Sequence, residues 1–201
     1  MNIKIIVSIF FFFVEHQFVL AVKKRYKFVL TSLLQTNKIR HLDKTLYLHL
    51  CGTHRILEDW DNPDFVCTAG LFHSIYGTQI FQRAAISTSR RAWLRWLIGS
   101  KAETLAYLFC VINRSAEFRR NRGSDEISVL DTTTGETIIL DRHSFVSLQE
   151  MEVANLLEQG CKKERITPFV DIELSTKAKA AIWKATEQPG EYVHYVKPLH
   201  D

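Results

Sequence analysis

Hydrophobic periodicity at helical spacing runs through residues 43–77 and constrains the fold most. From residue 43 to residue 60, apolar side chains recur at intervals of three and four positions, and His49 lies on that apolar stripe. A second helix is predicted to start with Asn62 as N-cap and Pro63 at the first helical position, and to end at Gly77. His73 lies on the apolar stripe of this second helix. The two histidines are therefore expected to face inward from consecutive helices.

Similar signals predict the remaining elements. Helices are predicted over residues 26–35, 88–98, 100–112, 147–159 and 175–186, and β-branched runs at 127–130 and 137–140 predict a hairpin. The helices that begin at Ser100 and Ser147 each carry a capping-box pattern, because a glutamate follows three positions after the serine. The sequence thus predicts a mainly α single domain with one small inserted β-hairpin.

Composition excludes some classes of protein. The 201 residues are 46% hydrophobic and 24% charged, which is the balance of one ordinary globular domain. The formal net charge of +4 is too small to indicate a nucleic-acid binder, so nucleic acid is not expected as a partner. The four cysteines are spaced singly, without a C-x-x-C pair, and are expected to be buried free thiols in a reducing compartment.

The N-terminus leaves three interpretations open. Residues 1–21 resemble a secretory signal peptide, but they are equally interpreted as a helix packed on the core or as an extension from an early start codon. Glu15, His16 and Gln17 interrupt the apolar run, so a stable membrane span is not expected. We expect a cytoplasmic protein, or a secreted one if residues 1–21 are a signal peptide. The expected organisation is a leader at 1–25, a helical domain at 26–165 and a C-terminal extension at 166–201 with one helix.

Sequence strings around the two histidines resemble known families. HLCGT at 49–53 and AGLFH at 69–73 resemble the first two motifs of HD-domain phosphohydrolases, with a spacing similar to that in the hydrolase domain of bacterial alarmone synthetase/hydrolases. The longer string AGLFHSIYGTQIF at 69–81 more closely resembles an uncharacterised family, domain of unknown function 6817, which belongs with HD-like folds. The resemblance covers residues 39–159 and implies an HD-domain-like helical bundle.

This resemblance also implies a site. In the HD superfamily, histidines and aspartates bind a divalent metal that activates a water molecule. Carried over to this chain, the metal ligands are His49 and His73, with Ser74 at the position of the paired aspartate and Asn155 at that of the distal aspartate. His41 precedes the first of the two helices and can fold back as a further ligand. Because two carboxylates are missing, Mn, Fe, Co or Zn is expected rather than Mg or Ca.

Other polar side chains are candidates for ligand contacts. Tyr76 and Thr78 lie next to the predicted helix end at Gly77, where they would form a pocket floor. Arg114 belongs to an arginine cluster near the hairpin that can attract phosphate groups. A structural interpretation stays open for each: buried histidines can hold helices in register, polar groups can satisfy a helix end, and arginines can be solvated.

Two functions from different classes follow. The first is an HD-like metal-dependent phosphohydrolase for a small phosphorylated or nucleotide-like substrate, in which His73 and Ser74 take part in catalysis. The second is a catalytically degenerate HD fold that binds a small molecule or a protein without turnover, because the metal-binding carboxylates are absent. A small-molecule ligand is expected in either case. The sequence does not indicate an oligomeric state.

Overall fold

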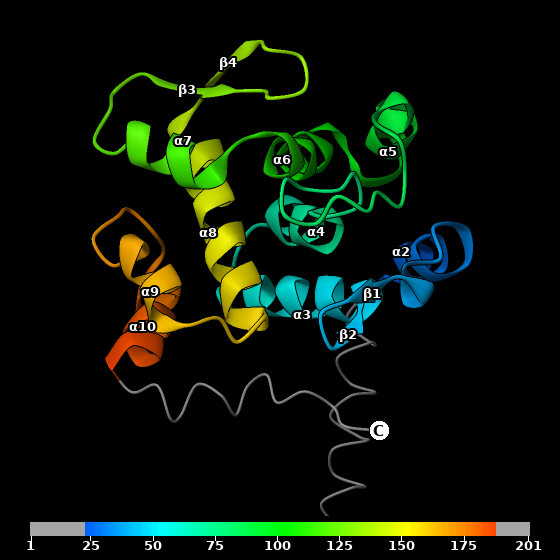
Figure 1. The fold of residues 1–201 in the computed structure, drawn as a ribbon, viewed down its shortest axis with the longest axis horizontal. Helices are drawn as coiled ribbons and strands as arrows, with labels where there is room; N and C mark the ends of the chain where they lie inside the picture. Colours follow the sequence, from blue (N-terminus) through cyan, green and yellow to red (C-terminus); the bar gives the residue numbers. More distant parts are fainter. Residues whose placement is uncertain (1–22, 188–201) are drawn as a thin grey trace, which may run out of the picture.

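The computed structural model describes residues 23–187 and is mainly helical (Figure 1). Residues 1–22, which are most of the predicted leader, and residues 188–201 lie outside the described residues. Two antiparallel ribbons of two strands each accompany the helices. The mainly α fold class and the inserted hairpin are therefore confirmed. None of the described helices is both long and apolar enough to cross a membrane.

The core is built around helix α3, Leu46–Asp59. It packs against α4, Asp64–Phe72, and against α8, Arg142–Glu158. Helix α4 packs in turn on α6, Ser100–Val111, so that α3, α4 and α6 form successive layers (Figure 1). Helix α8 runs past the ends of these layers and is buried on almost every side. Polar groups on α8 must therefore find partners inside the protein.

Shorter elements surround this core. Strand β1 (Arg40–His41) pairs with β2 (Lys44–Thr45), and β3 (Ile127–Leu130) pairs with β4 (Thr137–Leu140). The peripheral helices are α2 (Lys24–Phe28) with the π-helical turn Val29–Leu33, α5 (Arg91–Ile98), α7 (Arg114–Arg120), α9 (Lys163–Ile166) and α10 (Thr176–Glu187). Three short 3-10 turns cover Thr36–Lys38, Thr88–Arg90 and Thr167–Phe169.

Helices α3 and α8 do not begin at the predicted residues, because other side chains cap them. Helix α3 begins at Leu46 rather than at residue 43, because Thr45 ends the β1–β2 ribbon and its hydroxyl accepts the Leu48 N–H at 3.3 Å. Helix α8 begins before the predicted Ser147, because the Asp141 carboxylate accepts the Ser144 N–H at 2.8 Å. The capping box predicted at Ser147 is therefore wrong, and this serine lies inside the helix.

The capping box predicted at Ser100 is also wrong. Gly99 occupies the N-cap, and no side chain caps α6. The Glu103 carboxylate is fully buried and receives hydrogen bonds from Arg91 at 2.6 Å and from Arg95 at 2.8 Å. Glu103 on α6 thus binds two arginines at α5 through ion pairs. The local sequence pattern did not indicate this role.

The segment after α4 shapes one wall of the pocket described below. Helix α4 begins at Asp64, with Pro63 rather than the predicted Asn62 at its N-cap, and it ends at Phe72 rather than at the predicted Gly77. The chain then turns through Gly77, whose φ of +77° favours glycine. The Ile75 carbonyl accepts the N–H groups of Ala85 at 2.7 Å and Ile86 at 3.1 Å, which folds residues 78–84 back over the turn. These bonds fix the backbone that presents Ser74 and Thr78.

Candidate functional site

His49 and His73 meet inside the protein. His49 comes from the middle of α3, and His73 is the residue at which α4 ends. Both side chains are fully buried, and their Nε2 atoms lie 3.1 Å apart. The helical periodicity therefore located two side chains that touch, although 24 positions separate them in the sequence.

The backbone fixes the proton positions of this pair. The Nδ1 of His73 lies 2.6 Å from the Gly70 carbonyl, and because a carbonyl only accepts, Nδ1 carries the proton. Burial holds the pKa of His73 well below its ordinary value, so the ring is neutral and its Nε2 is an acceptor. The His49 Nε2–H must then donate in the contact between the two rings.

Glu158 completes the arrangement on the other side of His49. Its Oε2 contacts the Nδ1 of His49, and its Oε1 accepts a hydrogen bond from the Lys44 ammonium at 2.7 Å. Burial lowers the pKa of His49 to about 3 and raises the pKa of Glu158 to about 7. Because His49 already donates from Nε2, one proton must lie between Nδ1 and the carboxyl group. The opposed pKa shifts place this proton on Glu158.

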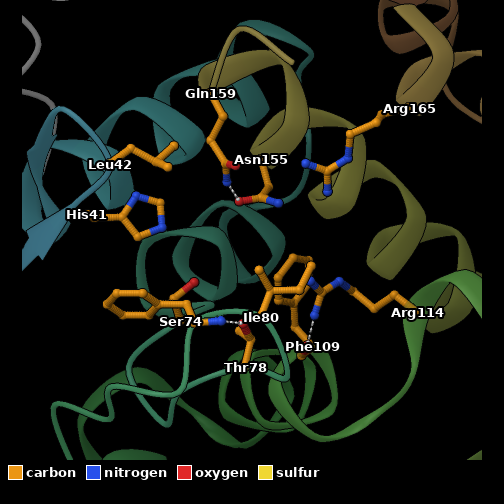
Figure 2. A pocket seen from close by; sticks show the side chains of 11 residues that line it. His41, Leu42, Ser74, Thr78, Ile80, Phe109, Arg114, Asn155, Gln159 and Arg165 are labelled. Carbon is orange, nitrogen blue, oxygen red and sulfur yellow. Dashed lines mark hydrogen bonds between the residues drawn. The ribbon is translucent and has the colours of Figure 1, made fainter. Parts of the chain in front are cut away.

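A pocket of about 160 Å³ lies beside the histidine pair. His41 stacks on His49 with 4.1 Å between ring centroids, and Phe109 packs edge-on against His73 at 4.9 Å. These two covering rings line the pocket, whereas His49 and His73 do not. The eleven lining residues are His41, Leu42, Ser74, Thr78, Ile80, Phe81, Phe109, Arg114, Asn155, Gln159 and Arg165 (Figure 2).

The lining carries positive charge and includes no acidic side chain. Arg114 donates to the Glu152 carboxylate at 2.7 Å, whereas the Arg165 guanidinium makes no hydrogen bond or ion pair with the described part of the chain. Burial raises the pKa of Glu152, but both arginines favour its ionised form. Two guanidinium groups beside one carboxylate leave an excess of positive charge at the pocket.

Neutral polar groups complete the polar wall. The Asn155 amide donates to Glu152 at 3.3 Å, and its oxygen accepts the Gln159 amide at 2.7 Å, which fixes the orientation of Asn155. His41 is 7% exposed, and its Nδ1 has no hydrogen-bond partner among residues 23–187. A buried polar atom without a partner costs about 1–3 kcal/mol. A ligand or a water molecule in the pocket would remove that cost.

The structure brings together most of the residues that the sequence singled out. His41, Ser74, Thr78, Arg114 and Asn155 line the pocket, and His49 and His73 lie directly behind it. Tyr76 does not line the pocket; its hydroxyl donates to Glu103 at 3.1 Å. The arginine cluster is not one patch, because Arg120 binds Glu117 and Arg122 donates to the Pro168 carbonyl.

Several residues of the site were not identified from the sequence. The sequence offers Glu158 only as one candidate for a missing metal ligand, together with His41, His54, Glu103 and Glu152, and it does not single out Gln159. Glu158 and Gln159 follow Asn155 by three and four positions, which is the spacing of one helix face, so this signal was present. Arg165 lies in a stretch where the hydrophobic periodicity weakens, and nothing local indicated that α9 would direct it to the pocket.

The donor set does not fit a metal ion held by protein groups alone. Among the described residues, no group of three or more His, Cys, Asp or Glu side chains could hold a metal. Of the two nearby carboxyl groups, Glu158 holds a proton and lies against the Lys44 ammonium, and the charge of Glu152 is balanced by Arg114. A dication placed between the imidazoles would therefore find little uncompensated negative charge.

Comparison with known proteins gives one family match. Residues 30–114 match the model of a family described as "Domain of unknown function (DUF6817)". The matched stretch contains both histidines and reaches Arg114, and α8 and α9 lie beyond it. No curated protein and no solved structure matches the chain. The match supports the closer of the two family resemblances and carries no statement about activity.

Proposed function

We propose that this chain, whose residues 30–114 resemble the DUF6817 family, binds a small anionic molecule in the pocket without turning it over. The observation that carries the proposal is a pocket lining with two arginines and no acidic side chain. Guanidinium groups form strong paired hydrogen bonds with phosphate and carboxylate groups. A phosphate-bearing ligand is favoured, because Asn155, Gln159 and Ser74 add neutral groups around the same space.

The two departures from the HD pattern support binding of an anion. Ser74 and Asn155, at the positions of the superfamily's aspartates, both line the pocket. Aspartates there would add two negative charges, which would attract a metal and repel an anion. We interpret the fold as an HD-like bundle in which loss of these charges has changed the preferred ligand from a cation to an anion.

The size of the pocket restricts the ligand. Pockets for drug-sized molecules measure about 300–1,000 Å³. At about 160 Å³, this pocket accommodates a phosphate or carboxylate group with a small part of the attached molecule. The rest of a larger ligand would extend into solvent.

Calorimetric titration with inorganic phosphate tests this function. Wild-type protein should bind with a Kd of about 1 mM, as expected for an anion of few atoms. Arg165→Ala should weaken binding about tenfold or more, since a hydrogen bond to a charged group is lost. Asn155→Asp should weaken it at least as much, because it adds a negative charge with almost no change in shape.

Arg119→Ala is the matched control, because it removes one exposed arginine that does not line the pocket. It should bind phosphate as wild type does. The proposal fails if wild-type protein does not bind phosphate or if all variants bind equally.

The metal-dependent phosphohydrolase is the second candidate, and one observation favours it. Each histidine has its Nδ1 against an oxygen, the Gly70 carbonyl for His73 and the Glu158 carboxyl for His49. This pattern is typical of imidazoles that bind metals through Nε2. The candidate still requires ligands beyond the two imidazoles, and the described residues supply no third member of such a group.

Metal content separates the two candidates. We expect protein purified without chelators to contain no stoichiometric Mn, Fe, Co or Zn, and these ions should not raise its melting temperature. A metal that binds only native protein must stabilise it. One metal ion per chain, lost in folded His49→Ala and His73→Ala variants, would favour the phosphohydrolase instead.

A further inference from the structure

We infer that the ligand carries an apolar group directly beside its anionic group, as in an aryl or branched-alkyl phosphate ester or carboxylic acid. This inference rests on the proposed function, since it assumes that an anion occupies the arginine side of the pocket. It adds the chemistry of the rest of the ligand. The observations behind it concern Leu42 and Ile80, two pocket residues whose side chains are largely exposed.

Leu42 is unfavourable in two respects. It has a φ of +53°, in the left-handed region that suits glycine or asparagine at the tip of a tight ribbon such as β1–β2. Its side chain is also 60% exposed. A leucine with this conformation and this exposure contributes little to the stability of the fold. Contact with an apolar part of a ligand would bury the side chain and explain both features.

Ile80 gives an independent second observation. It is 79% exposed and lines the same pocket. Its neighbour Phe81 also lines the pocket and packs against His41, with 4.9 Å between ring centroids. Single exposed apolar side chains are normal on protein surfaces, but exposed apolar side chains gathered around one pocket are typical of a ligand contact.

Leu42 and the two guanidinium groups lie on different sides of the pocket, and Ile80 lies between them (Figure 2). Figure 2 shows His41 and Leu42 on one side, with Arg114 and Arg165 on the opposite side. An anionic group that contacts the guanidinium of Arg165 would therefore direct its substituent toward Leu42. An ion without a substituent would leave the apolar side of the pocket in contact with water.

The test compares anions with and without an apolar group. Inorganic phosphate and phenyl phosphate form one pair, and acetate and benzoate form another, which distinguishes a phosphate ester from a carboxylic acid as the ligand. Binding of all four to wild-type protein is measured by calorimetry. Within the preferred pair, the phenyl compound should bind about tenfold more tightly, because the ring buries apolar surface.

Two variants test whether the apolar residues cause the tighter binding of the phenyl compound. Leu42→Gly and Ile80→Ser should each reduce the advantage of the phenyl compound about threefold or more, measured as the ratio of the two affinities within the same variant. Leu42→Gly should also melt at the same or a higher temperature than wild type, because glycine tolerates the positive φ. Ile139→Ser, at a residue that is 83% exposed on the hairpin, is the matched control and should leave all four affinities unchanged.

The outcomes separate this inference from the proposed function. If the simple anion binds but the phenyl compound shows no advantage in either pair, the inference is wrong and the proposed function stands. A phenyl advantage that both variants retain in full also contradicts the inference. If no anion binds at all, the proposed function fails, and the inference fails with it.

Discussion

The protonation states around His49 follow from burial and from the partners of each nitrogen atom. The Gly70 carbonyl sets the tautomer of His73, His73 sets that of His49, and His49 in turn requires a proton on the side of Glu158. Each step uses the rule that an acceptor needs a donor, together with the neutral state that burial imposes on His73. The resulting arrangement is electrically neutral apart from Lys44, and burying two neutral imidazoles costs far less than burying a charged one.

The raised pKa of Glu158 gives a pH-dependent prediction. The unfolded carboxyl ionises near its ordinary pKa of 4.5, whereas the folded one keeps its proton up to about pH 7. The contribution of this group to stability is thus complete below pH 4.5 and is lost as the pH rises through about 7. Glu158→Gln keeps a donor to His49 and cannot ionise. Its stability relative to wild type should therefore rise by about 2–4 kcal/mol between acidic and mildly basic pH.

Urea denaturation at a series of pH values measures this difference, with Glu164→Gln as a control at an exposed carboxyl group. Titration of the histidines in the unfolded chain is the same in wild type and variant and cancels in the difference. If Glu158→Gln is instead strongly destabilising at every pH, the pair is an imidazolium–carboxylate ion pair, and the proton assignment is wrong.

At the scale of elements, α3 and α8 can approach closely because Gly52 has no side chain. A Cβ atom at this position would lie 2.6 Å from the Cγ of Glu158. Gly52→Ala should therefore destabilise the protein by about 1–3 kcal/mol, although alanine favours a helix by about 1 kcal/mol. Chemical denaturation measures the effect. The same substitution in a Glu158→Ala background is the control.

In that background the clash is absent, and Gly52→Ala should be neutral or stabilising. An equal loss of stability in both backgrounds would show that Gly52 is required for another reason, and that the contact with Glu158 does not set the spacing of the two helices.

Helices with a strong apolar stripe could be predicted from the sequence, and their starts could not. The stripe through His49 located α3 within three residues, whereas α4 ends at Phe72, five residues before the predicted end at Gly77. Helix α8 begins earlier than predicted because Asp141, and not Ser147, is its N-cap. A local sequence pattern does not show which of two possible capping residues a helix uses. Helix α7 was not predicted, since its seven residues are mostly polar or charged and show no hydrophobic periodicity.

At the scale of the whole molecule, the pocket combines side chains from the β1–β2 ribbon, the segment after α4, and helices α6, α7, α8 and α9. The sequence located five of these eleven residues: Ser74, Asn155 and His41 through the family resemblance, and Thr78 and Arg114 through local polar and charge patterns. The others depend on tertiary packing: Arg165 reaches the pocket because α9 packs on α8, and Leu42 because its ribbon lies at the start of α3. Sequence patterns carry no direct signal for such contacts, because the residues lie far apart in the chain.

An NMR titration with inorganic phosphate tests whether this pocket binds an anion. We predict saturable shifts of the side-chain amide signals of Asn155 and Gln159 and of the Arg165 guanidinium signal, with smaller shifts at the amides of Ser74 and Thr78. The absence of saturable shifts up to about 10 mM phosphate would contradict the proposed anion site, given the affinity expected for so small an anion. So would shifts confined to the arginines of α7 outside the pocket.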